Sequence, residues 1–253
     1  MSTVGFERIG RVAEHLSVVE SVGSACRRAV GTRPRQVLTG VALTCALLAV
    51  VAVSAKAAPE EQTFLATSAI SQSILSIFVP FYGVLLISDL GRHQASDGSP
   101  WWSSLLAAGL FAVVAAVYGL VISAVAVAIV VGAGSTAAEP DPWRSVGLVL
   151  MGSLIMQLLA ASVGTGFGLL LQPPIVAELA TIVVPLSCWL LLGLTPVLIQ
   201  IREWTTPFAA VQHLFTGQLS PLNWLQWLVV IAIWGVGLNA IGSLRLQTPK
   251  GNR

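Results

Sequence analysis

The chain has little charge. Only 9% of its 253 residues are Asp, Glu, Lys or Arg, whereas a soluble domain carries about 25%. Hydrophobic residues make up 55% of the chain, and the mean hydropathy is +0.85. A surface this poor in charge cannot stay dispersed in water, so lipid must surround most of the chain. The formal net charge of +2 gives no basic surface of the kind that nucleic acid requires.

The motifs of several enzyme classes are missing. The three cysteines, Cys26, Cys45 and Cys188, have no metal-ligand or disulfide spacing. There is no phosphate-binding loop of the form GxxxxGK[ST], no HExxH and no GxSxG. We therefore expect a protein that is not an enzyme, that binds no metal or cofactor, and that does not hydrolyse ATP by that loop.

Stretches without charge indicate the fold class. Six such stretches are each long enough for a helix of roughly 20 residues, the length that crosses a hydrocarbon core. Backbone amides in lipid need internal partners, so these stretches must be helices. We predict an all-α membrane protein with six spans, near 37–56, 66–88, 104–132, 145–171, 176–200 and 224–244.

The basic residues predict the orientation. With the N-terminus inside, ten of the thirteen Lys and Arg fall in cytoplasmic segments, which is the expected bias. Both termini should then lie in the cytoplasm. We expect the protein itself to reside in the cell membrane of a bacterium. We expect three parts: a cytoplasmic N-terminal segment, a six-span domain and a short tail, over residues 1–35, 36–246 and 247–253.

Residues 4–30 form a separate element. Ile9, Val12, Leu16 and Val19 recur at steps of three and four residues, which predicts an amphipathic helix lying on the inner leaflet. A soluble helical tail is the alternative. No short apolar run typical of a secretory signal precedes the first span, so we expect the chain to keep its N-terminus.

Polar and small side chains inside the spans allow two interpretations. Ser68, Gln72 and Ser76 lie at four-residue steps, and could either bond neighbouring helices or line a substrate path. Ala160, Gly164 and Gly168 have the same spacing, which favours close helix packing. Pro80, Pro185 and Pro196 are expected inside spans, where each can bend its helix.

Glu178 is the one carboxylate that we place within a span. We expect it in the first turn of span five, where it would complement the helix dipole and stay hydrated. A functional contact is the other possibility. An ion-coupled carrier would need such a titratable group, and the shortage of others makes that class of transporter a weak hypothesis.

The C-terminal half, over 161–200, 202–224 and 242–247, resembles the permease subunits of type-2 ATP-binding-cassette exporters, especially the short actinobacterial kind. In that family a glycine-bearing fourth span ends in a short inner turn, and an outer segment leads into span six. Pro207, Phe208 and Ala210 match an element of that outer segment. The six-span topology and the amphipathic N-terminal helix match as well.

The resemblance implies a mechanism. Two permease subunits, in a homodimer or heterodimer, would pair around a path lined by spans two and five, and separate cytoplasmic ATPase subunits would bind ATP and Mg. The path would include Ser68, Gln72, Ser76 and Thr181. The ATPase would act through the N-terminal helix and the inner loop 88–104, and the outer segment 204–222 would form short helices. The implied coupling residues of that loop are Asp89, Arg92, His93 and Asp97.

The leading hypothesis is therefore an exporter permease that depends on a separate ATPase. Its path mixes small polar and apolar residues, which suits a drug, a lipid, an amphipathic peptide or a polyketide. The alternative is a non-transporting membrane scaffold or an immunity-type protein, which would use faces of small residues to bind other helices.

Overall fold

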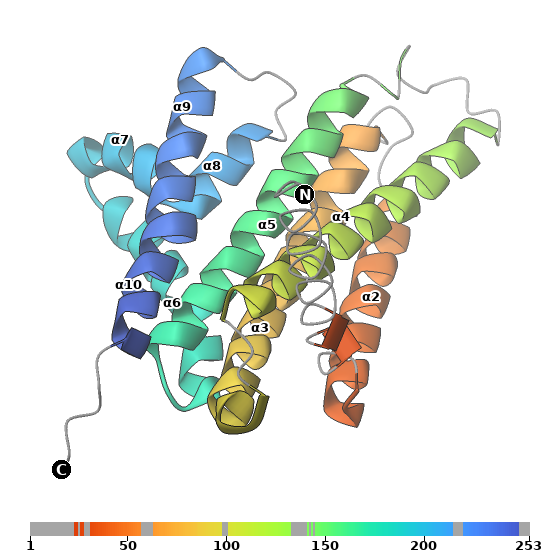
Figure 1. Cartoon of the computed structure of the whole chain (residues 1–253). Helices are drawn as coiled ribbons and strands as arrows, with labels where there is room; N and C mark the ends of the chain where they lie inside the picture. Colours follow the sequence, from red (N-terminus) through yellow and green to blue (C-terminus); the bar gives the residue numbers. More distant parts are fainter. Residues whose placement is uncertain are drawn as a thin grey trace, which may run out of the picture.

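A computed structural model describes residues 23–24, 26–27, 31–56, 63–97, 101–132, 141, 143, 145–214 and 220–247. Within this part of the chain the regular structure is entirely helical. The first half contains four long helices (Figure 1), which are α2 (Arg33–Ser54), α3 (Phe64–Asp97), α4 (Trp101–Gly132) and α5 (Val146–Leu170).

The second half is more broken. One long helix is followed by two short ones, and the last span continues through three segments: α6 (Pro174–Leu192), α7 (Pro196–Thr205), α8 (Pro207–Leu214), α9 (Pro221–Val230), the π-helix η2 (Ile231–Gly237) and α10 (Leu238–Gln247). Six helices are long and apolar enough to cross a bilayer. The protein is therefore a multi-pass membrane protein, as the sequence predicted.

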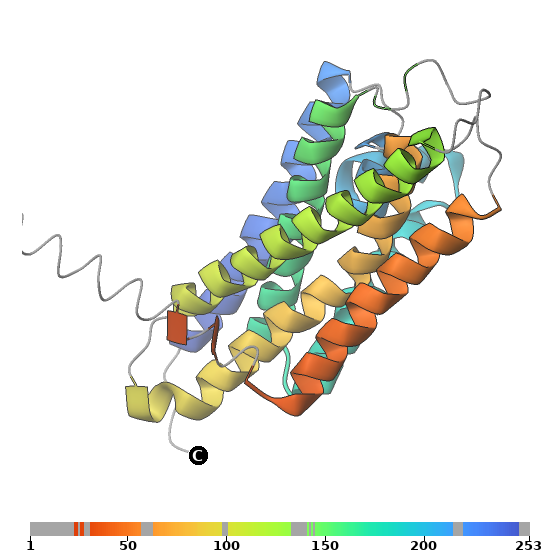
Figure 2. The ribbon, with the colours of Figure 1, turned by 90° about the vertical axis from the view of Figure 1, so that its right-hand side faces the viewer.

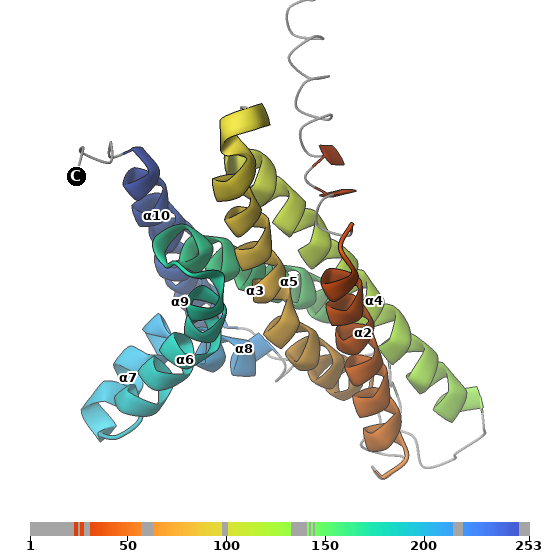
Figure 3. The same cartoon turned by 90° about the horizontal axis from the view of Figure 1, so that it is seen from below.

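The two central helices are α3 and α5. α3 contacts α2, α4, α5 and α6, and α5 also packs against α10. Seen from below, α6 and α7 extend to one side of this pair, while α2 and α4 lie on the other, and α8 sits between α6 and α3 (Figure 3). The start of α2 and the end of α10 lie at the same end of the bundle (Figure 1). An even number of spans requires this arrangement.

Glycine and proline bring α3 and α5 into backbone contact. A Cβ added at Gly164 would overlap the carbonyl oxygen of Pro80, and one at Gly83 would stand 2.7 Å from the backbone nitrogen of Thr165. Gly168 lies one turn further on, against Val84 and Ile87 of α3. The small residues of α5 therefore serve close packing, which membrane helices use because lipid gives them no hydrophobic driving force.

Two predicted boundaries are wrong for a common reason. The expected span five continues to residue 200, but α6 ends at Leu192 and Gly193–Thr195 breaks the helix. Pro196 does not bend a span; it begins α7, after an extended Thr195 at the N-cap. Proline suits the first helical position, where its missing N–H has no helical partner to lose. The expected short helices thus begin earlier than predicted, at Pro196.

The predicted inner loop 88–104 is also mostly helical. α3 continues to Asp97, and α4 begins at Trp101. α3 changes direction along its length (Figure 2), and it contains Pro80, which cannot donate the usual helical hydrogen bond. The predicted N-terminal helix over 4–30 falls almost wholly outside the described residues. Of that segment, Cys26 packs beside the cluster formed by α3 and α4.

Two side chains of the last span, one within the π-helix and one just after it, form hydrogen bonds with other helices. Trp234 donates its indole N–H to the carbonyl of Thr205, at 2.7 Å. Asn239 donates from Nδ2 to the carbonyls of Ser162 and Gly235, both at 2.7 Å. The segment therefore connects the end of α7 to the middle of α5.

We predict that Gly164→Ala destabilises the protein by about 1–3 kcal/mol, because the added methyl group must push α3 and α5 apart. Gly147→Ala, in the same helix, is the matched control. A Cβ there meets nothing within 4 Å, and alanine is the better helix former. Unfolding in mixed detergent micelles measures both changes. Equal stabilities of the two variants would contradict the close contact.

Candidate functional site

A cavity of about 440 Å³ lies between α3, α5, α6 and α8. Most of its wall is apolar, and none of the described residues that line it is charged. It is the kind of concave, largely apolar site with few polar groups that binds small molecules. Its lining residues are Ser73, Ser76, Ile77, Pro80, Met156, Leu159, Ala160, Val163, Thr181, Pro185, Leu186, Trp189, Pro207, Phe208 and Val211.

Two of the three hydroxyl-bearing residues in the cavity share an arrangement. Ser76 donates its hydroxyl to the carbonyl of Ser73 at 2.8 Å, and Thr181 donates to the carbonyl of Glu178 at 2.7 Å. Each of these residues also stands four positions before a proline, Pro80 or Pro185. A proline has no N–H, so neither the Ser76 nor the Thr181 carbonyl receives its usual helical donor. The cavity thus combines polar oxygen atoms with an apolar wall.

Of the predicted path residues, Ser76 and Thr181 meet at this cavity, whereas Ser68 and Gln72 do not. Ser68 and Gln72 are fully buried. Gln72 donates from Nε2 to the carbonyl of Ala116 at 2.9 Å, and its Oε1 accepts from Nε2 of Gln157 at 2.8 Å. In this chain Gln72 therefore bonds α3 to α4 and α5, which is the packing interpretation of the polar stripe.

Helix geometry explains why Ser76 lines the cavity whereas Ser68 and Gln72 lie between helices. A step of four residues advances about 40° more than a full turn, so Ser68 and Ser76 point about 80° apart. Ser71 lies on the side of α4, where its hydroxyl is 3.0 Å from that of Ser123. Ser73 and Ser76, together with Ile77 and Pro80, form the cavity face.

Three buried polar atoms near the contact between α3 and α5 have no hydrogen-bond partner among the described residues. They are Oγ of Ser68, Oγ of Ser153 and Oε1 of Gln157. Burying such atoms costs free energy. The polar layer between α3 and α5 is therefore only partly satisfied within the single chain.

The predicted coupling residues lie at the far end of α3. Asp89 forms an ion pair with Arg35 of α2, with 2.7 Å between the charged atoms, and side-chain exposures of 21% and 9%. Arg35 also donates to the carbonyl of Leu85 at 3.4 Å. Asp89 is thus neutralised within the chain, which leaves it less free to contact another subunit. Arg92, His93 and Asp97 lie on the last turns of α3, where the described structure does not include their side chains.

Glu178 and Ala160 lie at the edges of this site. Glu178 is half-buried and stands just past the first turn of α6, which begins at Pro174, so its predicted place in the first turn is wrong. It lies three residues before Thr181 and therefore near the same face of the helix. Ala160 lines the cavity and also packs beside the α3–α4 cluster.

Sequence reasoning missed Trp189 and did not bring the aromatic and proline residues of the wall together. Thr181, Pro185 and Trp189 recur at four-residue steps, a pattern that places them on one side of α6. Taken together, these three residues identify the face of α6 that lines the cavity. Phe208 enters only through the family resemblance, because nothing in its local sequence shows that α8 folds back against α5 and α6.

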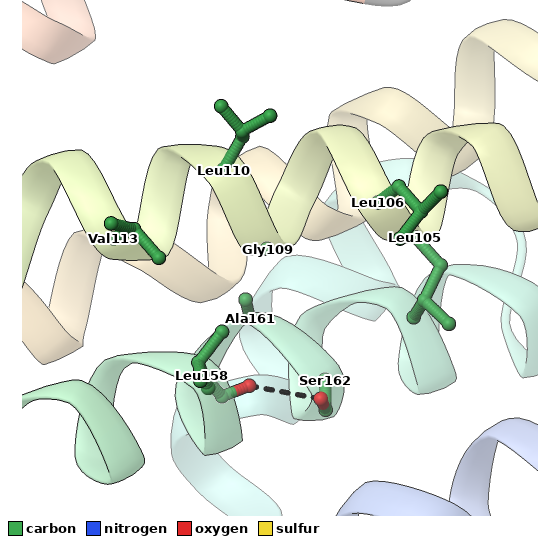
Figure 4. A pocket seen from close by; sticks show the side chains of 8 residues that line it. All are labelled: Leu105, Leu106, Gly109, Leu110, Val113, Leu158, Ala161 and Ser162. Atoms are coloured by element: carbon green, nitrogen blue, oxygen red, sulfur yellow. Dashed lines mark hydrogen bonds between the residues drawn. The ribbon is translucent and has the colours of Figure 1, made fainter. Parts of the chain in front are cut away.

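A second hollow lies between α4 and α5 (Figure 4). It has a volume of about 500 Å³, and its lining is apolar except for Ser162, whose hydroxyl donates to the carbonyl of Leu158 at 2.9 Å. This groove offers no free side-chain donor to a ligand. It is a poorer candidate than the cavity beside α6.

The described residues contain no group of His, Cys, Asp and Glu side chains arranged to hold a metal ion. Comparison of the chain with models of protein families, with curated proteins and with solved structures finds no match.

We predict that Gln72→Leu destabilises the protein by about 1–2 kcal/mol, since it removes two buried hydrogen bonds. Ser76→Ala should change the free energy of unfolding by less than about 0.5 kcal/mol, because Ser76 bonds only to its own helix. Unfolding in mixed micelles distinguishes the two variants. A destabilisation by Ser76→Ala as large as that by Gln72→Leu would show that both side chains serve packing.

We also predict that Asp89→Asn and Arg35→Gln each destabilise the protein by about 1–3 kcal/mol, because each leaves the opposite charge unpaired. Exchanging the two residues, Arg35→Asp with Asp89→Arg, should recover part of this loss. A double-mutant cycle on unfolding free energies gives the coupling. Additive effects would mean that the pair contributes nothing.

Proposed function

We propose that this protein is the transmembrane permease subunit of an ATP-binding-cassette exporter, and that a separate subunit hydrolyses the ATP. The observation that carries the proposal is the cavity between α3 and α6. These helices are spans two and five, the two that the family resemblance assigns to the substrate path. Ser76 of one and Thr181 of the other line the same cavity.

The chemistry of the cavity favours an amphipathic substrate. Its wall offers extensive apolar contact, two aromatic rings and a few hydroxyl groups, without a charged side chain among the described residues. Drugs, lipids, amphipathic peptides and polyketides all have this mixed character. An ion alone would leave most of the wall unused, which argues against an ion-coupled carrier.

The ends of α2 and α3 are the best candidates for coupling to the ATPase. Because Arg35 and Asp89 join these helices, a push on one would be transmitted to the other. Contact with the ATPase would fall to Arg92, His93 and Asp97, on the last turns of α3. We place this end of the bundle in the cytoplasm of a bacterium, following the distribution of Lys and Arg. A second permease subunit, identical or related, would complete the path.

A membrane scaffold or immunity-type protein is the second candidate, and one observation favours it. Ser68 and Gln72, half of the predicted path, are buried between helices rather than exposed in the cavity. A protein whose polar residues serve helix association alone would behave in this way. The two candidates differ in whether the cavity matters for activity.

Purification with native partners in mild detergent tests the leading proposal. We expect a subunit with a phosphate-binding loop to accompany the protein, and ATP to be needed for export. Filling the cavity with Ser76→Leu or Thr181→Leu should reduce export about tenfold, because the larger side chain occupies space that the substrate needs; tenfold corresponds to a loss of about 1.4 kcal/mol of binding.

The matched control is Thr44→Leu, which makes the same kind of change on the exposed face of α2 and should leave export unchanged. If no ATPase ever accompanies the protein and export ignores ATP, the proposal fails. If the two cavity variants retain full activity, the scaffold function is favoured.

A further inference from the structure

Arg202 has no counter-ion among the residues that the structure describes. It lies in α7 and is half-buried, and no carboxylate among the described residues comes within ion-pair distance of it. Its Nε is buried and has no hydrogen-bond partner there. A guanidinium taken out of water in this way needs an anion or strong acceptors.

The surroundings of Arg202 supply only part of that need. Its guanidinium carbon lies 5.2 Å from the centre of the Trp189 ring, a cation–π distance. Its Nη1 is 3.0 Å from the position of a Cβ at Gly193, the residue that follows α6. The end of a helix carries about half a negative charge. That partial charge attracts the guanidinium but does not neutralise it, so the site still favours an anion.

The length of α6 indicates that Arg202 lies near one surface of the bilayer. α6 is 19 residues long, close to the length that spans the hydrocarbon core, and Arg202 comes ten residues after its end. Trp189 and Trp204 lie on either side of it along the chain, and tryptophan is enriched at the level of lipid headgroups. A lipid phosphate is the anion that is abundant at this level.

Trp189 also joins Arg202 to the cavity. Its ring packs against the guanidinium and forms part of the cavity wall. Pro207 and Phe208, which begin α8 five residues after Arg202, line the same cavity. An unpaired cation at the bilayer surface therefore adjoins a hollow that is large enough for a hydrocarbon group.

We propose that this site binds a phospholipid, or an amphiphile with the same anionic phosphate headgroup, whose phosphate pairs with Arg202 and whose apolar chain occupies the cavity. Arginine matches a phosphate with two parallel hydrogen bonds. This lipid site rests on the cavity of the proposed function and gives the class of molecule that the cavity binds. Lipid binding itself does not require the transport step. A free phosphate ion would use Arg202 alone and leave the cavity unfilled.

Native mass spectrometry of the delipidated protein tests the site. The probes are phosphatidylglycerol, a diacylglycerol with the same chains, and inorganic phosphate. We expect phosphatidylglycerol to bind wild type tightest, diacylglycerol to bind more weakly, and inorganic phosphate not to bind measurably. Arg202→Gln should weaken the binding of phosphatidylglycerol about tenfold, to the level of diacylglycerol.

Three further variants separate charge, cavity and folding. Arg202→Lys should keep the affinity for phosphatidylglycerol within about threefold, because it retains the charge. Ala160→Leu should weaken both lipids, because it fills the cavity. Lys56→Gln removes an exposed cation two residues after the end of α2, a helix that does not line the cavity, and should change neither affinity.

Equal binding of phosphatidylglycerol by wild type and Arg202→Gln would overturn the proposal. It would also be overturned if inorganic phosphate bound as well as the lipid, or if Ala160→Leu had no effect on either lipid. If Arg202→Gln does not fold, the comparison of phosphatidylglycerol with diacylglycerol on wild type still tests the headgroup charge, Ala160→Leu still tests the cavity, and equal binding of the two lipids by wild type would overturn the proposal. No ATPase is present in these measurements, so their failure leaves the exporter proposal standing. Conversely, a protein that never associates with an ATPase can still have this lipid site.

Discussion

The contact between the backbones of α3 and α5 is the constraint on which the rest of the structure depends. Pro80 and Gly83 on one helix and Gly164 on the other allow no side chain between them, and this fixes how the two helices lie lengthwise. That alignment brings Gln157 opposite Gln72 and leaves Ser73 and Ser76 on the adjacent face of α3. α6 and α8 then close the cavity on that face. Loosening the central contact would therefore disturb the polar layer and the cavity together.

Two prolines determine the character of the cavity. Each stands four residues after a hydroxyl-bearing residue, Ser76 or Thr181, in a helix that lines the hollow. In both cases the proline deprives that residue's carbonyl of its helical partner, so a hydroxyl oxygen and a weakened helix occur at the same position. The site gains polarity in this way without placing an ionised group in the membrane, where it would be costly. The charge of Arg202 lies outside the cavity, against the ring of Trp189 in its wall.

The sequence was most informative about the spans, because the bilayer restricts which residues they can contain. Hydrocarbon excludes ionised groups, so the stretches without charge predicted all six spans. The end of span five was missed because Pro196 can either bend a helix or begin one, and the apolar pattern does not distinguish the two. The polar stripe of α3 was half right, since four-residue steps drift around a helix and carry Ser76 away from Gln72.

The pairing of Asp89 with Arg35 joins residues far apart in sequence, and the cavity needs walls from four helices. Neither could be read from local patterns.

The π-helix in the last span has an evolutionary consequence. A π-helical turn accommodates an extra residue compared with an α-helical one, so a single-residue insertion can be absorbed there without shifting the residues on either side. Trp234 bonds to α7, and Asn239 bonds to α5. The wider turn allows these two side chains to face different neighbours. Restoring a regular α-helix over Ile231–Gly237 would rotate Trp234 relative to Asn239 and turn one of them away from its partner.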